Sequence, residues 1–191
     1  MTVSTFKWTI DRYHQAIEAG VFDDTSVELL NGELVEMSPE GVPHAGLTDS
    51  SSRYLQRLLG DRAIVRVGHP ITLANHSEPE PDLAIVEPIE EVYKNEHHPY
   101  PENIFWVIEY SNKSLQKDLE IKSKTYAKAD IAEYWVINLK TRELIVFRDP
   151  VKGEYRSQQK FTTGTINPLS FPEVQIDVFP EVQIDVVRLL R

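Results

Sequence analysis

Acidic and basic side chains occur in three parts of this chain, in an order that could support metal-assisted chemistry. Asp82 follows a proline-rich segment, Glu109 comes at the end of an apolar run, and Lys122 lies on the predicted helix that follows. Two carboxylates at strand ends with a lysine nearby suit a divalent cation that activates water at a phosphate. This arrangement predicts a nuclease.

The residues Asp118, Lys122 and Tyr126 are spaced four apart. Residues at this spacing lie on one face of a helix, so the three side chains are expected to point together. Lys124 would be rotated by about 200° from Lys122 and should face away. In the structural alternative, Asp118 and Lys122 form a surface ion pair and Tyr126 packs on the core.

The composition is that of an ordinary globular protein. The chain has 191 residues, of which 41% are hydrophobic and 26% charged, and this favours one domain over residues 1–191. Cysteine is absent, so a metal must be bound by oxygen or imidazole, and a reducing compartment is compatible. No apolar run approaches the roughly 20 residues that span a bilayer. We expect a cytoplasmic protein that does not enter membranes.

The net charge of −10 opposes nucleic-acid binding, which is driven by basic surfaces. Much of the negative charge, however, lies within residues 78–102, while residues 53–66 and 113–128 carry an excess of arginine and lysine. These two basic stretches could flank a DNA backbone, or they could be solvated helix faces.

Local patterns predict the first elements of the chain. Thr9 is a suitable N-cap for a short helix that ends near Gly20. Residues 27–37 read as a hairpin because Asn31-Gly32 supplies the positive φ angles of a type I′ turn. A helix is predicted over residues 44–59.

The rest of the sequence predicts a mixture of strands and helices. Residues 104–108 form an apolar run typical of a central strand, and a helix capped by Asn112 or Ser114 leads to a further strand through a right-handed crossover. Residues 88–103 are expected to be a solvated loop. The predicted short strands cover residues 63–67, 71–73, 83–86, 133–138 and 144–147, with weaker ones near 155 and beyond 168.

The octapeptide FPEVQIDV occupies residues 171–178 and is repeated without change at 179–186. Val174, Ile176 and Val178 alternate with polar residues, as in a strand with one buried face. We expect one copy to pair in the sheet and the other to lie at an edge or to extend from the C-terminus. The duplication itself is expected to have no functional role.

In order and spacing, several of these segments together resemble the Uma2 family. They are NGE at 31–33, His44, Pro81-Asp82, IEYS at 108–111, Asp118, Lys122, Tyr126 and EYW at 133–135. The resemblance covers most of the chain, apart from the terminal duplication. It implies membership of the PD-(D/E)xK superfamily and its restriction-endonuclease-like fold. The expected α/β fold has a mixed central sheet flanked by helices, an N-terminal hairpin and additional strands.

The resemblance also implies roles for individual residues. Asp82 and Glu109 would ligate Mg²⁺ or Mn²⁺, with the backbone carbonyl of Tyr110 as a third oxygen ligand, which agrees with the preference of hard cations for oxygen. Ser111 stands where the superfamily motif has lysine. Lys122 is therefore the candidate for the displaced catalytic lysine.

Three further residues are candidates for accessory roles. Glu28 and Glu33 flank the Asn-Gly turn, where either could add a ligand or hold a water, and we rank Glu33 slightly above Glu28. The alternative for at least one of them is a solvent-facing hairpin residue. His44 could contact a phosphate or assist proton transfer, and a loop or capping role is equally compatible.

Two functions follow from these patterns. The first is a Mg²⁺-dependent endonuclease that hydrolyses DNA phosphodiester bonds, with a homodimer expected if both strands are cut. The second is a catalytically inactive module of the same fold that binds nucleic acid or a protein partner, because Ser111 replaces the motif lysine.

Overall fold

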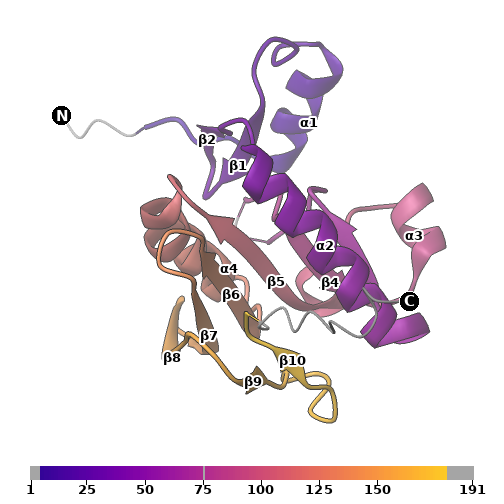
Figure 1. The fold of residues 1–191 in the computed structure, drawn as a ribbon. Helices are drawn as coiled ribbons and strands as arrows, with labels where there is room; N and C mark the ends of the chain where they lie inside the picture. Colours follow the sequence, from indigo (N-terminus) through magenta and orange to yellow (C-terminus); the bar gives the residue numbers. More distant parts are fainter. Residues whose placement is uncertain (1–4, 75, 180–191) are drawn as a thin grey trace.

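A six-stranded mixed sheet forms the centre of the fold (Figure 1). The computed structural model describes residues 5–74 and 76–179. The strand order is β3-β4-β5-β6-β7-β8, in which β5 and β6 are parallel and every other neighbouring pair is antiparallel. These strands are β3 (Ile64–Val67), β4 (Leu83–Val86), β5 (Ile104–Ser111), β6 (Glu133–Asn138), β7 (Glu143–Val151) and β8 (Glu154–Phe161). The expected fold class, a mixed central sheet with helices and an N-terminal hairpin, is confirmed.

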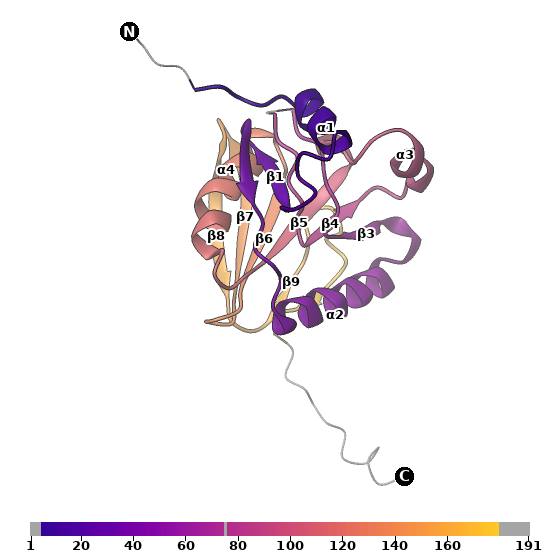
Figure 2. The same cartoon turned by 90° about the horizontal axis from the view of Figure 1, so that it is seen from above.

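Helices cover both faces of the sheet (Figure 2). On one face, Leu55 and Leu59 of α2 (Val42–Leu59) pack with Ile85 and Trp106. On the other, Tyr126 of α4 (Ser123–Lys128) packs in the cluster that contains Ala84, Val107 and Tyr134. Successive residues of β4 and β5 thus enter different cores, which explains why β5 is an almost uninterrupted apolar run.

The N-terminal part follows its predicted pattern closely. Helix α1 (Ile10–Glu18) begins after Thr9, whose hydroxyl accepts a hydrogen bond from the Arg12 amide. The hairpin of β1 (Val27–Leu30) and β2 (Glu33–Glu36) turns at Asn31 and Gly32, whose φ angles are 51° and 76°. These left-handed angles are those that a type I′ turn requires.

Several local predictions were wrong. Residues 71–73 form no strand, and the supposed loop over residues 88–103 contains helix α3 (Glu90–Asn95) and a 3₁₀ turn, η2 (Pro101–Asn103). Strand β5 continues three residues beyond the predicted end, so Glu109 lies inside it. Helix α2 begins two residues before His44, preceded by Gly41, and a 3₁₀ turn, η1 (Gly60–Arg62), follows it.

The predicted helix after β5 has an irregular middle. It runs from residue 115 to 128, and its central part, η3 (Lys117–Lys122), is a π-helix in which the Ser123 amide bonds to the Asp118 carbonyl. π-helical turns are rare and are often found at functional sites.

The first copy of the octapeptide forms part of the core on the α2 face. Its Val174, Ile176 and Val178 are buried while the residues between them are exposed, as the alternation predicts. Strand β10 (Ile176–Asp177), however, pairs with β9 (Thr165–Ile166) in a separate two-stranded sheet and not in the central one. Residues 180–186 of the second copy lie outside the described residues.

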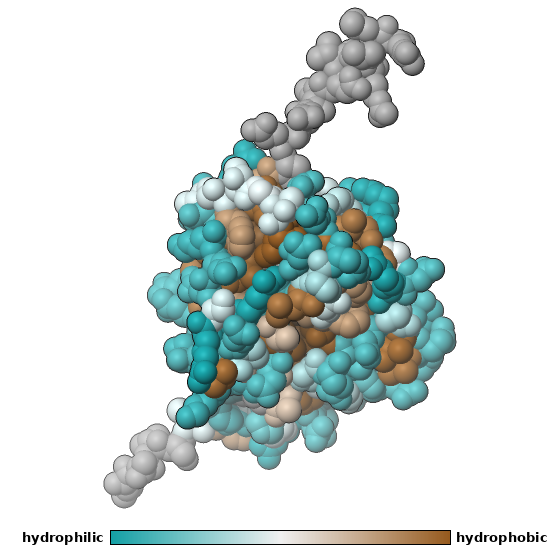
Figure 3. Space-filling view, turned by 90° about the horizontal axis from the view of Figure 1, so that it is seen from below, coloured by the Kyte–Doolittle hydropathy of each residue, from teal (hydrophilic) through white to brown (hydrophobic). Residues whose placement is uncertain are grey.

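The described surface is mostly hydrophilic on the face drawn in Figure 3, with brown hydrophobic patches between polar side chains. Among the described residues, no helix is both long and apolar enough to cross a membrane.

Candidate functional site

A buried cluster of charged side chains connects η3 and α4 to β5. The Lys122 ammonium and the Tyr126 hydroxyl each donate a 2.8 Å hydrogen bond to Oε1 of Glu109. All three side chains are almost fully buried, whereas Lys124 is exposed. The predicted helix face therefore exists, and its side chains meet the strand acid.

Asp118, the third residue of that face, is bound to hydroxyls instead of lysine. Its Oδ2 accepts hydrogen bonds from Ser111 Oγ at 2.6 Å and Ser114 Oγ at 2.7 Å, and its carbonyl accepts one from Tyr134. Ser111, at the motif position of the missing lysine, thus ties β5 to the start of the following helix. These bonds hold the helix in the position from which Lys122 reaches Glu109.

Glu28 belongs to this cluster and Glu33 does not, which reverses their predicted ranking. Glu28 is fully buried, with one oxygen 2.9 Å from Lys117 Nζ and the other 3.1 Å from Lys122 Nζ. Glu33 is exposed and pairs with Lys7. The reason is the placement of the hairpin: β1 lies against the segment before β4 through Leu29 and Glu78, which leaves β2 on the outside.

Asp82 approaches the cluster from the neighbouring strand. Leu83 pairs with Ile108, so one further antiparallel step sets Asp82 opposite Glu109, with both side chains on the same face. Asp82 Oδ2 accepts a 2.6 Å hydrogen bond from the Tyr110 amide. Because the amide and carbonyl of one strand residue point to the same side, the Tyr110 carbonyl also faces Asp82.

His44 and Glu40 extend the site beyond the predicted acids. Nε2 of His44 lies 3.0 Å from Asp82 Oδ1, and one ligand atom each from Glu40, His44 and Asp82 lie within 4.8 Å of one another. Glu40 was missed in the sequence, although its spacing of four residues before His44 was visible. Contact with Asp82 raises the pKa of His44, outweighing the opposite effect of burial.

The electrostatics of the cluster are dominated by carboxylates. Burial raises the pKa of Glu109 to about 8, against the lowering effect of Lys122 and with a further rise from the charge of Asp82. Burial lowers the pKa of Lys122, but the charges of Glu109 and Glu28 outweigh it, so the net pKa is raised and the ammonium stays charged. For Glu28, the two lysines outweigh burial and lower the pKa.

The donor set fits a hard divalent cation. Asp82, Glu40 and His44 bring ligand atoms within 4.8 Å of one another, while Glu109 and the Tyr110 carbonyl lie on the adjacent strand β5. The raised pKa of Glu109 indicates that its negative charge is undercompensated by the protein, and a bound cation would relieve this.

Comparison with known proteins agrees with this picture. No curated protein matches the chain significantly. A crystal structure of a "putative nuclease belonging to DUF820" from Anabaena variabilis is similar in fold, with a TM-score of 0.67 and 14% sequence identity over 81% of this chain and 88% of that one. The model of the Uma2 family, described as "Putative restriction endonuclease", matches residues 10–179. The chain therefore belongs to the Uma2 family.

Proposed function

We propose that this protein is a metal-dependent endonuclease that hydrolyses phosphodiester bonds of DNA. The observation that carries the proposal is the hydrogen bond from the Tyr110 amide to Asp82, beside Glu109 on β5, together with the buried Lys122 ammonium 2.8 Å from Glu109. Charged groups of these types are otherwise rare in a protein interior.

In this proposal, Asp82, Glu109 and the Tyr110 carbonyl hold Mg²⁺ or Mn²⁺, with Glu40 and His44 as further donors. The ion would lower the pKa of a bound water and polarise the phosphate oxygens. The Lys122 ammonium would stabilise charge that develops on the phosphate. Glu28 would position the Lys122 ammonium through their ion pair. Tyr126 would position the Glu109 carboxylate through its hydrogen bond.

A specific observation favours the second candidate, an inactive module that binds nucleic acid or a protein. Lys122 Nζ lies between Glu28 and Glu109, and its side chain is only 4% exposed. A lysine held in this way could serve purely to stabilise the two buried carboxylates. The two functions therefore differ in whether Lys122 is available to a substrate.

Plasmid nicking separates the candidates. Supercoiled DNA is incubated with the protein and Mg²⁺ or Mn²⁺, beside the isosteric variants Asp82→Asn and Glu109→Gln and the control Glu33→Gln, whose carboxylate is exposed outside the cluster. We expect nicking by the wild type and the control only. Nicking that survives both site substitutions would refute the proposed site. Absence of nicking together with measurable DNA binding would favour the inactive module.

If the enzyme cuts both strands, we expect it to act as a homodimer, because each strand needs its own site. Light scattering of the protein with and without a short duplex measures this, and a 1:1 complex that makes double-strand breaks would contradict it.

A further inference from the structure

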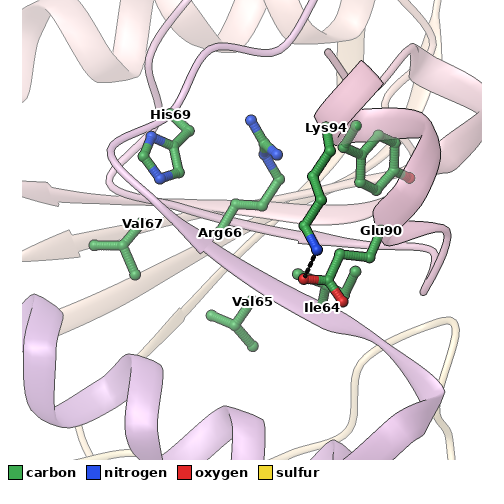
Figure 4. Close-up of a pocket in the computed structure, with 8 residues that line it drawn as sticks. Ile64, Val65, Arg66, Val67, His69, Glu90 and Lys94 are labelled. Atoms are coloured by element: carbon green, nitrogen blue, oxygen red, sulfur yellow. Dashed lines mark ion pairs between the residues drawn. The ribbon is translucent and has the colours of Figure 1, made fainter. Parts of the chain in front are cut away.

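A second feature of interest is a pocket of about 320 Å³ beside β3, the strand at one edge of the central sheet. Its polar lining comes from Arg66 and His69 and, on α3, from Glu90, Tyr93 and Lys94. In Figure 4, Arg66 extends between His69 and Lys94, away from Val65 and Val67. The volume is at the small end of ligand pockets, which run from roughly 300 to 1,000 Å³.

Arg66 is a half-buried cation that lacks an acidic partner. Among the described residues, no carboxylate lies within ion-pair distance of its guanidinium, and Nε is buried without a hydrogen-bond acceptor. The guanidinium lies 5.6 Å from the centroid of the Tyr93 ring, which supports it through a cation–π contact. A buried donor without an acceptor is costly, so this group is suited to an acceptor from outside.

The Tyr93 hydroxyl is also buried and without a partner among the described residues. Burial, followed by the charge of Glu87, raises the pKa of Tyr93 to about 12, so the hydroxyl remains a donor at neutral pH. Lys94 is paired with two carboxylates, Glu90 at 3.0 Å and Glu91 at 3.5 Å. Within the part of the chain that the structure describes, Arg66 therefore has no carboxylate in ion-pair contact, and Arg66 and Tyr93 each keep a donor without a partner, which together suit a small anion.

The position of the pocket relates it to the candidate metal site. Arg66 pairs with Ala84, and the Gly68 amide bonds to the Asp82 carbonyl, so Arg66 lies two residues along β3 from the position opposite Asp82. Alternation puts both side chains on the same face of the sheet. Two strand residues span ~7 Å, so the pocket lies close to the candidate metal site along the sheet edge.

We propose that the pocket formed by Arg66, His69 and Tyr93 binds a phosphate group, supplied by the DNA strand next to the bond that is cut. The assignment to DNA rests on the proposed function. The binding of a phosphate group does not depend on that function, because a free phosphate compound would supply the same group.

Inorganic phosphate is the first probe. The side-chain Nε–H signals of ¹⁵N-labelled protein are recorded during a phosphate titration at constant ionic strength, with Arg66 assigned from Arg66→Gln. We expect a saturable shift of Arg66 and none of Arg156, an exposed arginine on β8 at the opposite edge of the sheet. Tyr93→Phe, which keeps all charges, should weaken phosphate binding by about three- to tenfold through the loss of one hydrogen bond. If Arg66 shifts no more than Arg156, the proposal is wrong.

The second arm identifies the source of the phosphate. Binding of a short duplex is measured in EDTA, where cleavage plays no part, with Arg66→Gln and the charge-matched control Arg156→Gln. We expect only Arg66→Gln to weaken binding and to reduce the slope of log K against log salt by about 1. Equal binding by both variants would refute the assignment to DNA and leave a free phosphate compound as the ligand. A selective loss in a protein that nicks no plasmid would support the pocket and refute the nuclease function.

Discussion

The Lys122 ammonium donates a 2.8 Å hydrogen bond to Glu109 in the interior of the protein, and both side chains are about 95% buried. Glu109 is an expected metal ligand and Lys122 the expected catalytic lysine, so the two groups are coupled before any substrate arrives. Their charges and those of Glu28 and Asp82 must be considered together.

Glu28→Gln should destabilise the protein by roughly 3 kcal/mol, because it removes the carboxylate from a buried pair and leaves Lys122 and Lys117 undercompensated. Urea unfolding at pH 7 measures this loss. Glu33→Gln is the matched control from the same hairpin, and its exposed carboxylate should matter little. Equal stability of the two variants would show that Glu28 does not support the lysines.

Lys122→Met should reduce the rate of plasmid nicking by at least about 100-fold, the effect of removing one stabilising charge at a reacting phosphate. Lys124→Met removes the same charge from the exposed side of the helix and should leave the rate unchanged. A nicking rate of Lys122→Met near that of Lys124→Met would exclude a role for this ammonium in the reaction.

The stability of the metal-free protein should fall as pH rises from about 5 to 8. Glu109 has a pKa of about 8 when folded and an ordinary carboxyl pKa when unfolded, so within this window the folded state binds more protons. Glu109 alone should lower the free energy of unfolding by up to about 1.4 kcal/mol for each pH unit in this window. Urea unfolding of the wild type and Glu109→Gln across this range isolates the contribution. Parallel pH profiles would contradict the raised pKa.

Metal binding should release a proton near pH 7, because a ligating Glu109 must be ionised. The apparent affinity for Mn²⁺ should therefore rise with pH up to about 8 in the wild type. Calorimetry in buffers of different ionisation enthalpy measures the number of protons released. Binding that is independent of pH and releases no proton would argue against Glu109 as a ligand.

Ser111→Ala should cost about 1 kcal/mol of stability while leaving nicking within a few-fold of the wild type, because Ser111 bonds to Asp118 and not to Glu109 or Lys122. Ser114→Ala, which removes the other hydroxyl on Asp118, is the comparison. Loss of nicking by Ser111→Ala at unchanged stability would give the serine a direct part in the chemistry.

The sequence by itself determined those features that depend on neighbouring residues. The Asn31-Gly32 turn, the Thr9 cap and the helix face of Lys122 and Tyr126 follow from backbone preferences and from a period of 3.6 residues. The apolar run of β5 likewise identified a strand buried on both faces. These features need no knowledge of distant segments.

Only the tertiary structure decided which acids meet Lys122. Glu28 and Glu33 lie on the two strands that flank the same turn, and Glu28 meets Lys122 because β1, not β2, docks against Glu78, about 50 residues further along the chain. The same is true of Glu40 and His44, which reach Asp82 through the packing of α2 on the sheet. Such contacts depend on how whole elements bury their apolar faces against one another, and local sequence patterns do not contain that information.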